Sequence, residues 1–152
     1  MHQPIRTMVI AGLCLFAGAA HAQNADGVKF ASAAELKAML AKVGPTGSAV
    51  AQVPTAPGAR VAIVRRDKDS EPEAHGKLSD QIVVREGKAS MLIGGTLSGD
   101  RLQAPDERRG GTITGGTLYP LEAGDTILVP PGVPHRVLVP AVTSFVYMAI
   151  KF

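Results

Sequence analysis

Short runs of apolar and polar residues alternate through the C-terminal part of the chain. Seven runs are rich in Val, Ile, Thr, Phe and Tyr and are separated by Gly or Pro, at 60–66, 81–86, 88–93, 112–121, 126–129, 135–139 and 144–152. Short strands at near-regular spacing between turn residues are typical of a β-sandwich or a small barrel. The pattern therefore predicts an all-β domain over residues 60–152.

The last run differs from the others because it is apolar on both faces. Successive side chains of a strand point to opposite sides, which groups Val146 with Met148 and Ile150, and Phe145 with Tyr147 and Ala149. A strand that is apolar on both sides needs cover for its second face. We expect this cover from an N-terminal helix or from another subunit, and the second choice makes a homodimer a fair hypothesis.

Residues 30–43 show helical spacing instead, with apolar residues at Leu36, Met39, Leu40 and Val43. Ser32 followed three residues later by Glu35 forms a capping box, and Gly44-Pro45 is a stop signal. This predicts one short amphipathic helix. Residues 44–59 are rich in Pro, Gly, Ser and Thr and are predicted to be an extended linker or an irregular edge.

Two further features lie between the predicted strands, a polar segment and a recurring tetrapeptide. Residues 98–111 are polar and contain several Gly residues and a Pro, which predicts a loop that is either mobile or arched over the barrel mouth. The tetrapeptide at 94–97, Gly-Gly-Thr-Leu, recurs at 115–118. We interpret this recurrence as chance or local hairpin similarity rather than as a true repeat.

Residues 1–22 have the layout of a secretory signal. Arg6 lies in a short start, residues 8–20 are apolar, and Ala20-His21-Ala22 ends the run with small residues around a variable one. An apolar run of about 13 residues is too short to cross a bilayer of roughly 30 Å as a helix. We therefore expect cleavage after Ala22, a periplasmic or secreted mature protein, and no stable membrane anchor.

Composition narrows the choice of partners. Cys14 is the only cysteine and leaves with the leader, so the mature chain of about 130 residues has no disulfide and depends on its core. Once Arg6 is removed, 15 of the 16 Lys and Arg residues stand against 13 Asp and Glu residues. No block of Lys and Arg stands among aromatic residues, and Trp is absent, so we do not expect a nucleic-acid partner.

The candidate chemistry lies in two segments, 73–80 and 124–135. The first contains Glu73, His75 and Asp80, and the second ends with His135. Glu73 and His75 are two residues apart and therefore share one face of a strand. If the two segments face each other in the fold, these four side chains form one cluster of oxygen and nitrogen ligands. Each His alone is more often a structural residue, and Glu73 could instead lie in a solvated acidic turn.

These segments resemble the two motifs of the cupin superfamily. In the first motif, Gly-x5-His-x-His-x3–4-Glu-x6-Gly, this chain has Glu73 at the first His, His75 at the second, Asp80 at the Glu and Gly87 at the closing Gly, while Asp67 replaces the opening Gly. In the second motif, Gly-x5-Pro-x-Gly-x2-His-x3-Asn, Gly124, Pro130, Gly132 and His135 match and Val139 replaces the Asn. The resemblance covers roughly residues 60–152. It divides the chain into a signal peptide at 1–22, an N-terminal helix and linker at 23–59, and a cupin barrel at 60–152.

The resemblance implies an antiparallel double-sheet jelly-roll barrel with a divalent metal at its mouth. His75 and His135 would supply imidazole nitrogens and Asp80 an anionic oxygen, while Glu73 would complete the ligand set or act as a catalytic base. Two His and up to two carboxylates would accept Mn, Fe, Ni or Zn. Because Asp80 is one methylene shorter than Glu, its strand must come closer or the ligand is lost.

The function classes that remain differ in whether turnover occurs. In the first, the protein is a periplasmic enzyme that acts on a small polar molecule by metal-dependent chemistry. In the second, it is a non-catalytic cupin that binds a small ligand, with weak or lost metal binding. A structural accessory protein is a third and weaker choice. Glu73 discriminates between them, because an inward orientation favours an enzyme and an outward orientation favours binding alone.

Overall fold

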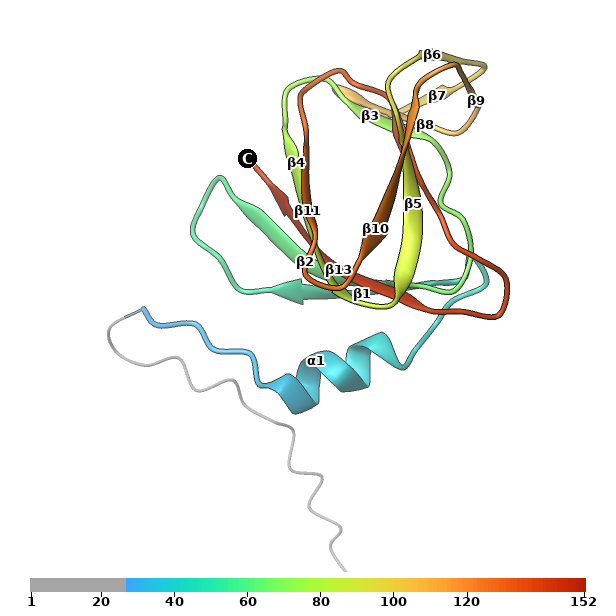
Figure 1. The fold of residues 1–152 in the computed structure, drawn as a ribbon. Helices are drawn as coiled ribbons and strands as arrows, with labels where there is room; N and C mark the ends of the chain where they lie inside the picture. The colour runs from blue at the N-terminus through green and yellow to red at the C-terminus, as the bar shows by residue number, and fades with distance from the viewer. Residues whose placement is uncertain (1–26) are drawn as a thin grey trace, which may run out of the picture.

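The computed structural model describes residues 27–152, and the expected leader at 1–22 lies outside this range. Within it, the chain forms two antiparallel sheets that face each other, with a two-stranded ribbon at one end (Figure 1). The first sheet has the order β1 (Ser48–Val53), β2 (Arg60–Arg66), β13 (Phe145–Lys151), β4 (Asp80–Glu86) and β11 (Thr126–Val129). The second has the order β10 (Thr117–Glu122), β5 (Lys88–Ile93), β12 (His135–Leu138), β3 (Glu73–His75), β8 (Glu107–Arg109) and β7 (Arg101–Ala104). This is the expected all-β antiparallel double-sheet barrel.

The main core lies between the inward faces of the two sheets. Its buried members come from both sheets and are Val64, Ile82, Val84, Ala89, Met91, Leu121, Val129, Val137, Phe145, Tyr147 and Ala149. Phe145 and Met91 are among its largest fully buried side chains. Phe145, Tyr147 and Ala149 share the inward face of β13, as the two-residue period of a strand requires. The barrel therefore has an apolar interior below its open end.

The outer face of β13 is covered by the N-terminal helix, α1 (Ala33–Leu40), which was one of the two expected covers. Leu36 and Leu40 of the helix pack against a second buried cluster formed by Ala51, Ile63 and Val146. These three residues come from β1, β2 and β13, which are neighbours in the first sheet. The helix thus closes the sheet on the side away from the main core.

The predicted capping box fixes the start of α1. The backbone N–H of Ser32 donates to Glu35 Oε2 at 2.8 Å, and the N–H of Glu35 donates to Ser32 Oγ at 3.2 Å. The helix ends at Leu40, before the end that residue spacing predicted. In the range 27–152, no helix is both long and apolar enough to cross a membrane.

Two segments that were not predicted as strands belong to the sheets. Residues 44–59, expected to be a linker or an irregular edge, contain β1, which pairs regularly with β2 along its whole length. Residues 98–111, expected to be a loop, contain the hairpin β7–β8, which joins the second sheet through β3. Every side chain of β7 is exposed, so the hairpin has no apolar alternation by which a strand could be recognised.

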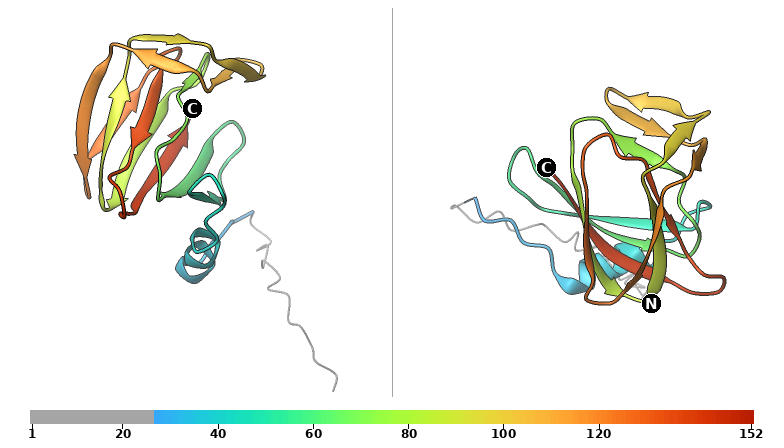
Figure 2. Two further views of the ribbon diagram at one scale, coloured as in Figure 1. Left: turned by 90° about the vertical axis from the view of Figure 1, so that its right-hand side faces the viewer. Right: turned by 45° about the horizontal axis from the view of Figure 1, so that its top comes forward.

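The predicted strand at 112–121 is divided in two by Gly115-Gly116, into β9 (Thr112–Thr114) and β10. β9 pairs with β6 (Thr96–Ser98), and this ribbon extends beyond the end of the barrel (Figure 2). Gly95 and Gly116 both have positive φ, and a Cβ at Gly95 would clash with the carbonyl oxygen of Thr114. The recurring Gly-Gly pairs are therefore the two bends at which one hairpin leaves the large sheet.

Replacing Phe145 by Ala tests the importance of the main core. The side chain has no exposed surface, so we expect the substitution to lower the free energy of unfolding by about 3–5 kcal/mol. The matched control is Phe30→Ala, which removes the same atoms from a side chain that is 72% exposed and should change stability by less than about 0.5 kcal/mol. Urea unfolding measures both, and equal losses would contradict this description of the core.

Candidate metal centre

The predicted ligands lie at the ends of strands at one end of the barrel. Glu73 and His75 are the first and last residues of β3, Asp80 is the first residue of β4, and His135 is the first residue of β12. Across the second sheet, Glu73 stands directly opposite His135 on one side and opposite Arg109 on the other. Directly opposite residues in antiparallel strands share a face, so these three side chains form a row.

A second row crosses the first sheet at the same end of the barrel. Lys151, the last residue of β13, stands directly opposite Asp80 of β4 and opposite Arg60 of β2. The two rows belong to sheets that face each other, which brings acidic and basic side chains together across the barrel mouth. The site is therefore built by cross-strand register, and no long loop is needed to position it.

The four predicted ligand residues come together as the sequence predicted. One possible ligand atom from each residue lies within 4.8 Å of all the others. His135 Nε2 is 3.5 Å from Glu73 Oε1 and 3.7 Å from Asp80 Oδ2, and His75 Nε2 is 3.6 Å from Asp80 Oδ2 and 3.8 Å from Glu73 Oε2. Glu73 is only 9% exposed and turns inward, so the alternative of a solvated acidic turn is wrong.

Both imidazoles present the same nitrogen to the cluster. His135 Nδ1 is 3.0 Å from the carbonyl oxygen of Val133, and His75 Nδ1 is 2.6 Å from Glu107 Oε2. An oxygen acceptor at this position fixes the proton on Nδ1, which leaves the lone pair of a neutral ring on Nε2. The Nζ of Lys151 lies 2.5 Å from His75 Nε2, which agrees with an acceptor at that atom. Both rings are therefore oriented to offer Nε2 as a ligand.

Three charged residues of the site were missed by sequence analysis. Arg109 Nη1 is 2.6 Å from Glu73 Oε2, Lys151 Nζ is 3.4 Å from Asp80 Oδ2, and Glu107 orients His75. For Lys151 a signal was present, because it continues the inward-facing series 145, 147 and 149 of the last strand. For Glu107 and Arg109 the sequence offers no comparable signal, since their hairpin lacks apolar alternation.

Two arginines on strands that carry predicted ligands lie outside the site. Arg136 binds Asp69, with Nη2 and Oδ2 3.1 Å apart, and Arg85 is exposed on β4. Neither Arg85 nor Arg136 is part of the ligand group at the barrel mouth. The positive charges that do face the cluster come from the ends of other strands.

Burial and opposite charge act against each other on the pKa values of the site. Burial alone would raise the pKa of Glu73, but His135, Arg109 and Lys151 together lower it to about 2. Burial would also raise the pKa of Asp80, yet His135, His75 and Lys151 hold it well below its usual range. Burial alone would lower the pKa of His135, but the carboxylates of Asp80 and Glu73 raise it to about 9. Without a bound metal, both carboxylates are ionised and His135 is cationic at neutral pH.

The residues present fit a divalent transition metal. Bonds of about 2.1 Å in a tetrahedral site separate the ligand atoms by roughly 3.4 Å, close to the spacings of the imidazole and carboxylate atoms seen here. Among the described residues, Asp80 Oδ1 and His135 Nε2 are buried without a hydrogen-bond partner, which is unusual for polar atoms in a folded protein. The donor set of two imidazoles and two carboxylates is typical of Mn, Fe, Ni or Zn.

Comparison with known proteins bears out the fold. No protein-family model and no curated protein matches the sequence. Among solved structures, an uncharacterized conserved protein with a double-stranded β-helix domain from Klebsiella pneumoniae is 14% identical, with a TM-score of 0.55 over 76% of this chain and 84% of that chain. The cupin domain of Cnp3 from Schizosaccharomyces pombe has a TM-score of 0.52 at 10% identity, over 74% of this chain and 65% of that one.

A cupin-2 domain protein from Rhodospirillum rubrum is similar to the same degree, with a TM-score of 0.52 at 10% identity over 70% of this chain and 60% of that one. At such identities the likeness shows a shared fold. The chain therefore has the double-stranded β-helix fold of cupin domains, as its two motifs predicted. The four residues that the motifs predict as ligands lie together in this fold.

The pKa values predict how the stability of the metal-free protein depends on pH. His135 has a folded pKa of about 9 against an ordinary value of 6.5, so its contribution is fully present below pH 6.5 and is lost as pH rises to 9. Glu73 has a folded pKa of about 2 against 4.5, so its contribution is present above pH 4.5 and is lost as pH falls toward 2. Urea unfolding in the presence of a chelator should therefore give a maximum between pH 4.5 and 6.5.

The control for this prediction is His135→Asn, which carries no titratable group at the same position. Its free energy of unfolding should change less than that of the wild type between pH 6.5 and 9. The same decline in both proteins would show that His135 does not govern the alkaline side of the profile.

Proposed function

We propose that the protein binds a divalent transition metal through His75, His135, Asp80 and Glu73, and a small polar molecule beside it. One possible ligand atom from each of these four residues converges at the barrel mouth, and both imidazoles present Nε2 to the cluster. This convergence is the observation that supports the proposal. Hydrogen bonds from the far side of each ring to a carbonyl or a carboxylate are a common accompaniment of metal-binding His. The cupin resemblance adds support, since a metal at the barrel mouth is what it implies.

The protein side chains suit a Lewis-acid site. A bound ion would supply the polarisation of a carbonyl or the activation of a water molecule. Glu73, with a pKa of about 2, is ionised at all physiological pH values and is tied to Arg109. A general base works best when its pKa lies near the working pH, so Glu73 fits a ligand better than the catalytic base that was the other choice. Turnover itself stays a prediction.

The second candidate function is binding without catalysis, and Lys151 is the observation that favours it. Its ammonium lies against His75 Nε2 and Asp80 Oδ2, which are two of the atoms that a metal would use. The Lys151 ammonium therefore competes with a metal ion for the same two ligand atoms. A strong competition would leave a ligand-binding barrel whose metal affinity is weak.

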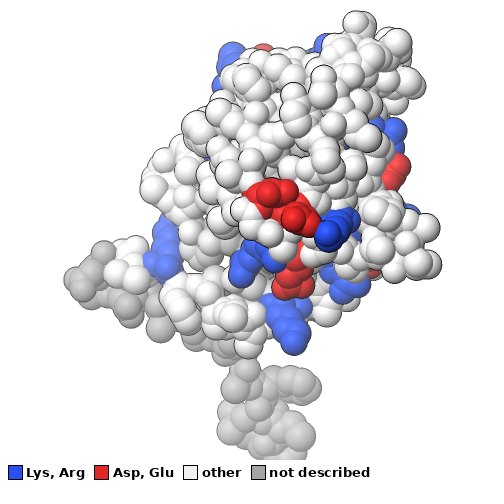
Figure 3. Space-filling view, in the orientation of Figure 1, with Lys and Arg blue, Asp and Glu red and all other residues white. Residues whose placement is uncertain are grey.

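The distribution of charged side chains on the surface favours a small ligand over a polyanion. On the face shown in Figure 3, acidic side chains are flanked by Lys and Arg, and this face has no broad patch of one sign. Export to the periplasm or outside the cell, which the leader suggests, and a homodimer both stay part of the proposal. Light scattering of the mature protein tests the dimer, and a monomer at high concentration would remove it.

Metal analysis of the purified mature protein tests the proposed ligand set. We expect about one divalent ion per chain in the wild type, and a loss of at least tenfold in affinity for the double variant His75→Ala, His135→Ala and for Asp80→Asn. The matched control is Asp106→Asn, the same change at an acid that lies outside the cluster. Asp106 has a positive φ that Asn tolerates well, so the control should fold normally. Equal metal content in Asp80→Asn and Asp106→Asn would refute the assignment.

Replacing Lys151 by Met separates the two candidate functions. The variant removes the competing ammonium and keeps most of the aliphatic side chain, so we expect tighter metal binding, by roughly tenfold, in a direct titration with Zn²⁺. Lys77→Met, which removes an exposed ammonium outside the cluster, is the control and should leave the affinity unchanged. A wild type without metal beside a Lys151→Met variant with metal would support binding without catalysis. Weaker binding in Lys151→Met would contradict the competition.

A further inference from the structure

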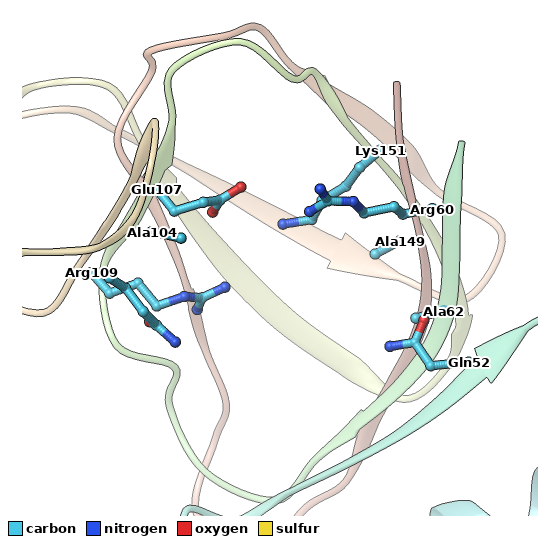
Figure 4. A pocket seen from close by; sticks show the side chains of 9 residues that line it. Gln52, Arg60, Ala62, Ala104, Glu107, Arg109, Ala149 and Lys151 are labelled. Atoms are coloured by element: carbon cyan, nitrogen blue, oxygen red, sulfur yellow. The ribbon is translucent and has the colours of Figure 1, made fainter. Parts of the chain in front are cut away.

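A cavity of about 290 Å³ lies beside the ligand cluster, because three residues that contact the cluster also line the cavity, namely Glu107, Arg109 and Lys151. Its walls come from β1, β2 and β13 on one side and from the hairpin β7–β8 on the other (Figure 4). Three of its lining residues are alanines from three different strands, Ala62, Ala104 and Ala149, whose small side chains leave the space open. Its volume lies at the lower end of the roughly 300–1,000 Å³ typical of small-molecule sites.

The charges that line the cavity are mainly positive. Arg60, Arg109 and Lys151 stand against a single acid, Glu107, and two amide side chains, those of Gln52 and Gln103, complete the polar lining. Figure 4 shows Arg109 and Glu107 extending from one wall toward Lys151 and Arg60 on the other. A molecule in the cavity would therefore meet cationic groups from two opposite sides.

Arg60 is exposed, and its charge has no acidic partner among the described residues. It stands directly opposite Lys151 on the neighbouring strand, and like charges in this arrangement are unfavourable. Lys151 is compensated by Asp80 on its other side, whereas Arg60 forms no ion pair with any residue in the range 27–152. An anion in the cavity would compensate Arg60 and remove the repulsion.

Metal binding would increase this positive charge. Arg109 and Lys151 now face Glu73 and Asp80, the same two carboxylates that the proposed metal uses. A divalent ion neutralises those two carboxylates, so the two basic side chains lose their compensation. The three cations and one acid that line the cavity would then have a surplus of two positive charges that Glu73 and Asp80 no longer offset.

We propose that this cavity binds a small carboxylate anion, with two carboxylate groups matching the two charged walls. The inference rests on the proposed function, because it makes the carboxylate the polar molecule that binds beside the metal. The planar guanidinium groups of Arg60 and Arg109 match the geometry of a carboxylate, which each can bind through two parallel hydrogen bonds. Metal and anion then strengthen each other's binding, since each offsets the charge that the other leaves unpaired.

Calorimetry with succinate as the probe tests the inference, with the neutral analogue succinamide as the ligand control. We expect succinate to bind the Zn²⁺-loaded protein at least tenfold more tightly than the metal-free protein, and succinamide to bind neither form. Arg60→Gln should weaken succinate binding roughly tenfold at unchanged Zn²⁺ content. Arg85→Gln makes the same change in charge at an exposed arginine outside this cavity and should have no effect.

The outcomes separate this inference from the proposed function. If Zn²⁺ binds but succinate does not, or if Arg60→Gln and Arg85→Gln bind succinate equally, the carboxylate site is refuted while the metal centre stands. If Zn²⁺ fails to bind, the proposed function is refuted. In that case, succinate binding to the metal-free protein with the same loss in Arg60→Gln supports the carboxylate site alone, and no binding refutes both.

Discussion

Two carboxylates buried at the mouth of a β-barrel must be compensated by positive charge. In this molecule, the pairing of neighbouring strands places that charge beside them. Glu73 and Asp80 lie on opposite sheets, and each stands directly across from a basic residue on the next strand, Arg109 and Lys151. Removing one partner of a buried ion pair typically costs about 3–5 kcal/mol, because the remaining charge is left without compensation. The register of the strands and the chemistry of the site therefore depend on each other.

The same constraint would apply to the site with the proposed metal bound. In the metal-free protein, Arg109, Lys151 and His135 carry the positive charge that balances the two carboxylates. A divalent ion would take over this role, which requires His135 to lose its proton and Lys151 to leave Asp80. Metal affinity is therefore set by a difference between two compensated states, and the basic residues lower it. The basic side chains that a metal would release face the adjoining cavity, and this would couple the proposed metal binding to the proposed anion binding.

The sequence predicts the parts of this molecule that repeat a physical pattern. The two-residue period of the strands placed Glu73 and His75 on one face, and Gly and Pro spacing located β5 and β11 at their observed bounds. The β7–β8 hairpin was not predictable, because its side chains face solvent or a polar cavity and have no apolar period. Arg109 reaches the site only through a pairing with β3 that sequence cannot reveal. The register between distant strands could not be predicted from the sequence, and the charge balance of the site depends on that register.

The departures from the cupin pattern compensate each other. Glu73 stands at a His position of the motif, so an acid replaces an imidazole there. Asp80 stands at a Glu position, so a shorter acid replaces a longer one. Asp80 Oδ2 still lies 3.6 Å from His75 Nε2 and 3.7 Å from His135 Nε2, because β4 begins at Asp80 and is held beside β13. Glu73 approaches the same two rings from the opposite sheet. A second acid in place of a neutral imidazole adds one negative charge, and Arg109 is the residue that compensates it. The acid at position 73 and the arginine at position 109 therefore form one compensated pair in this site.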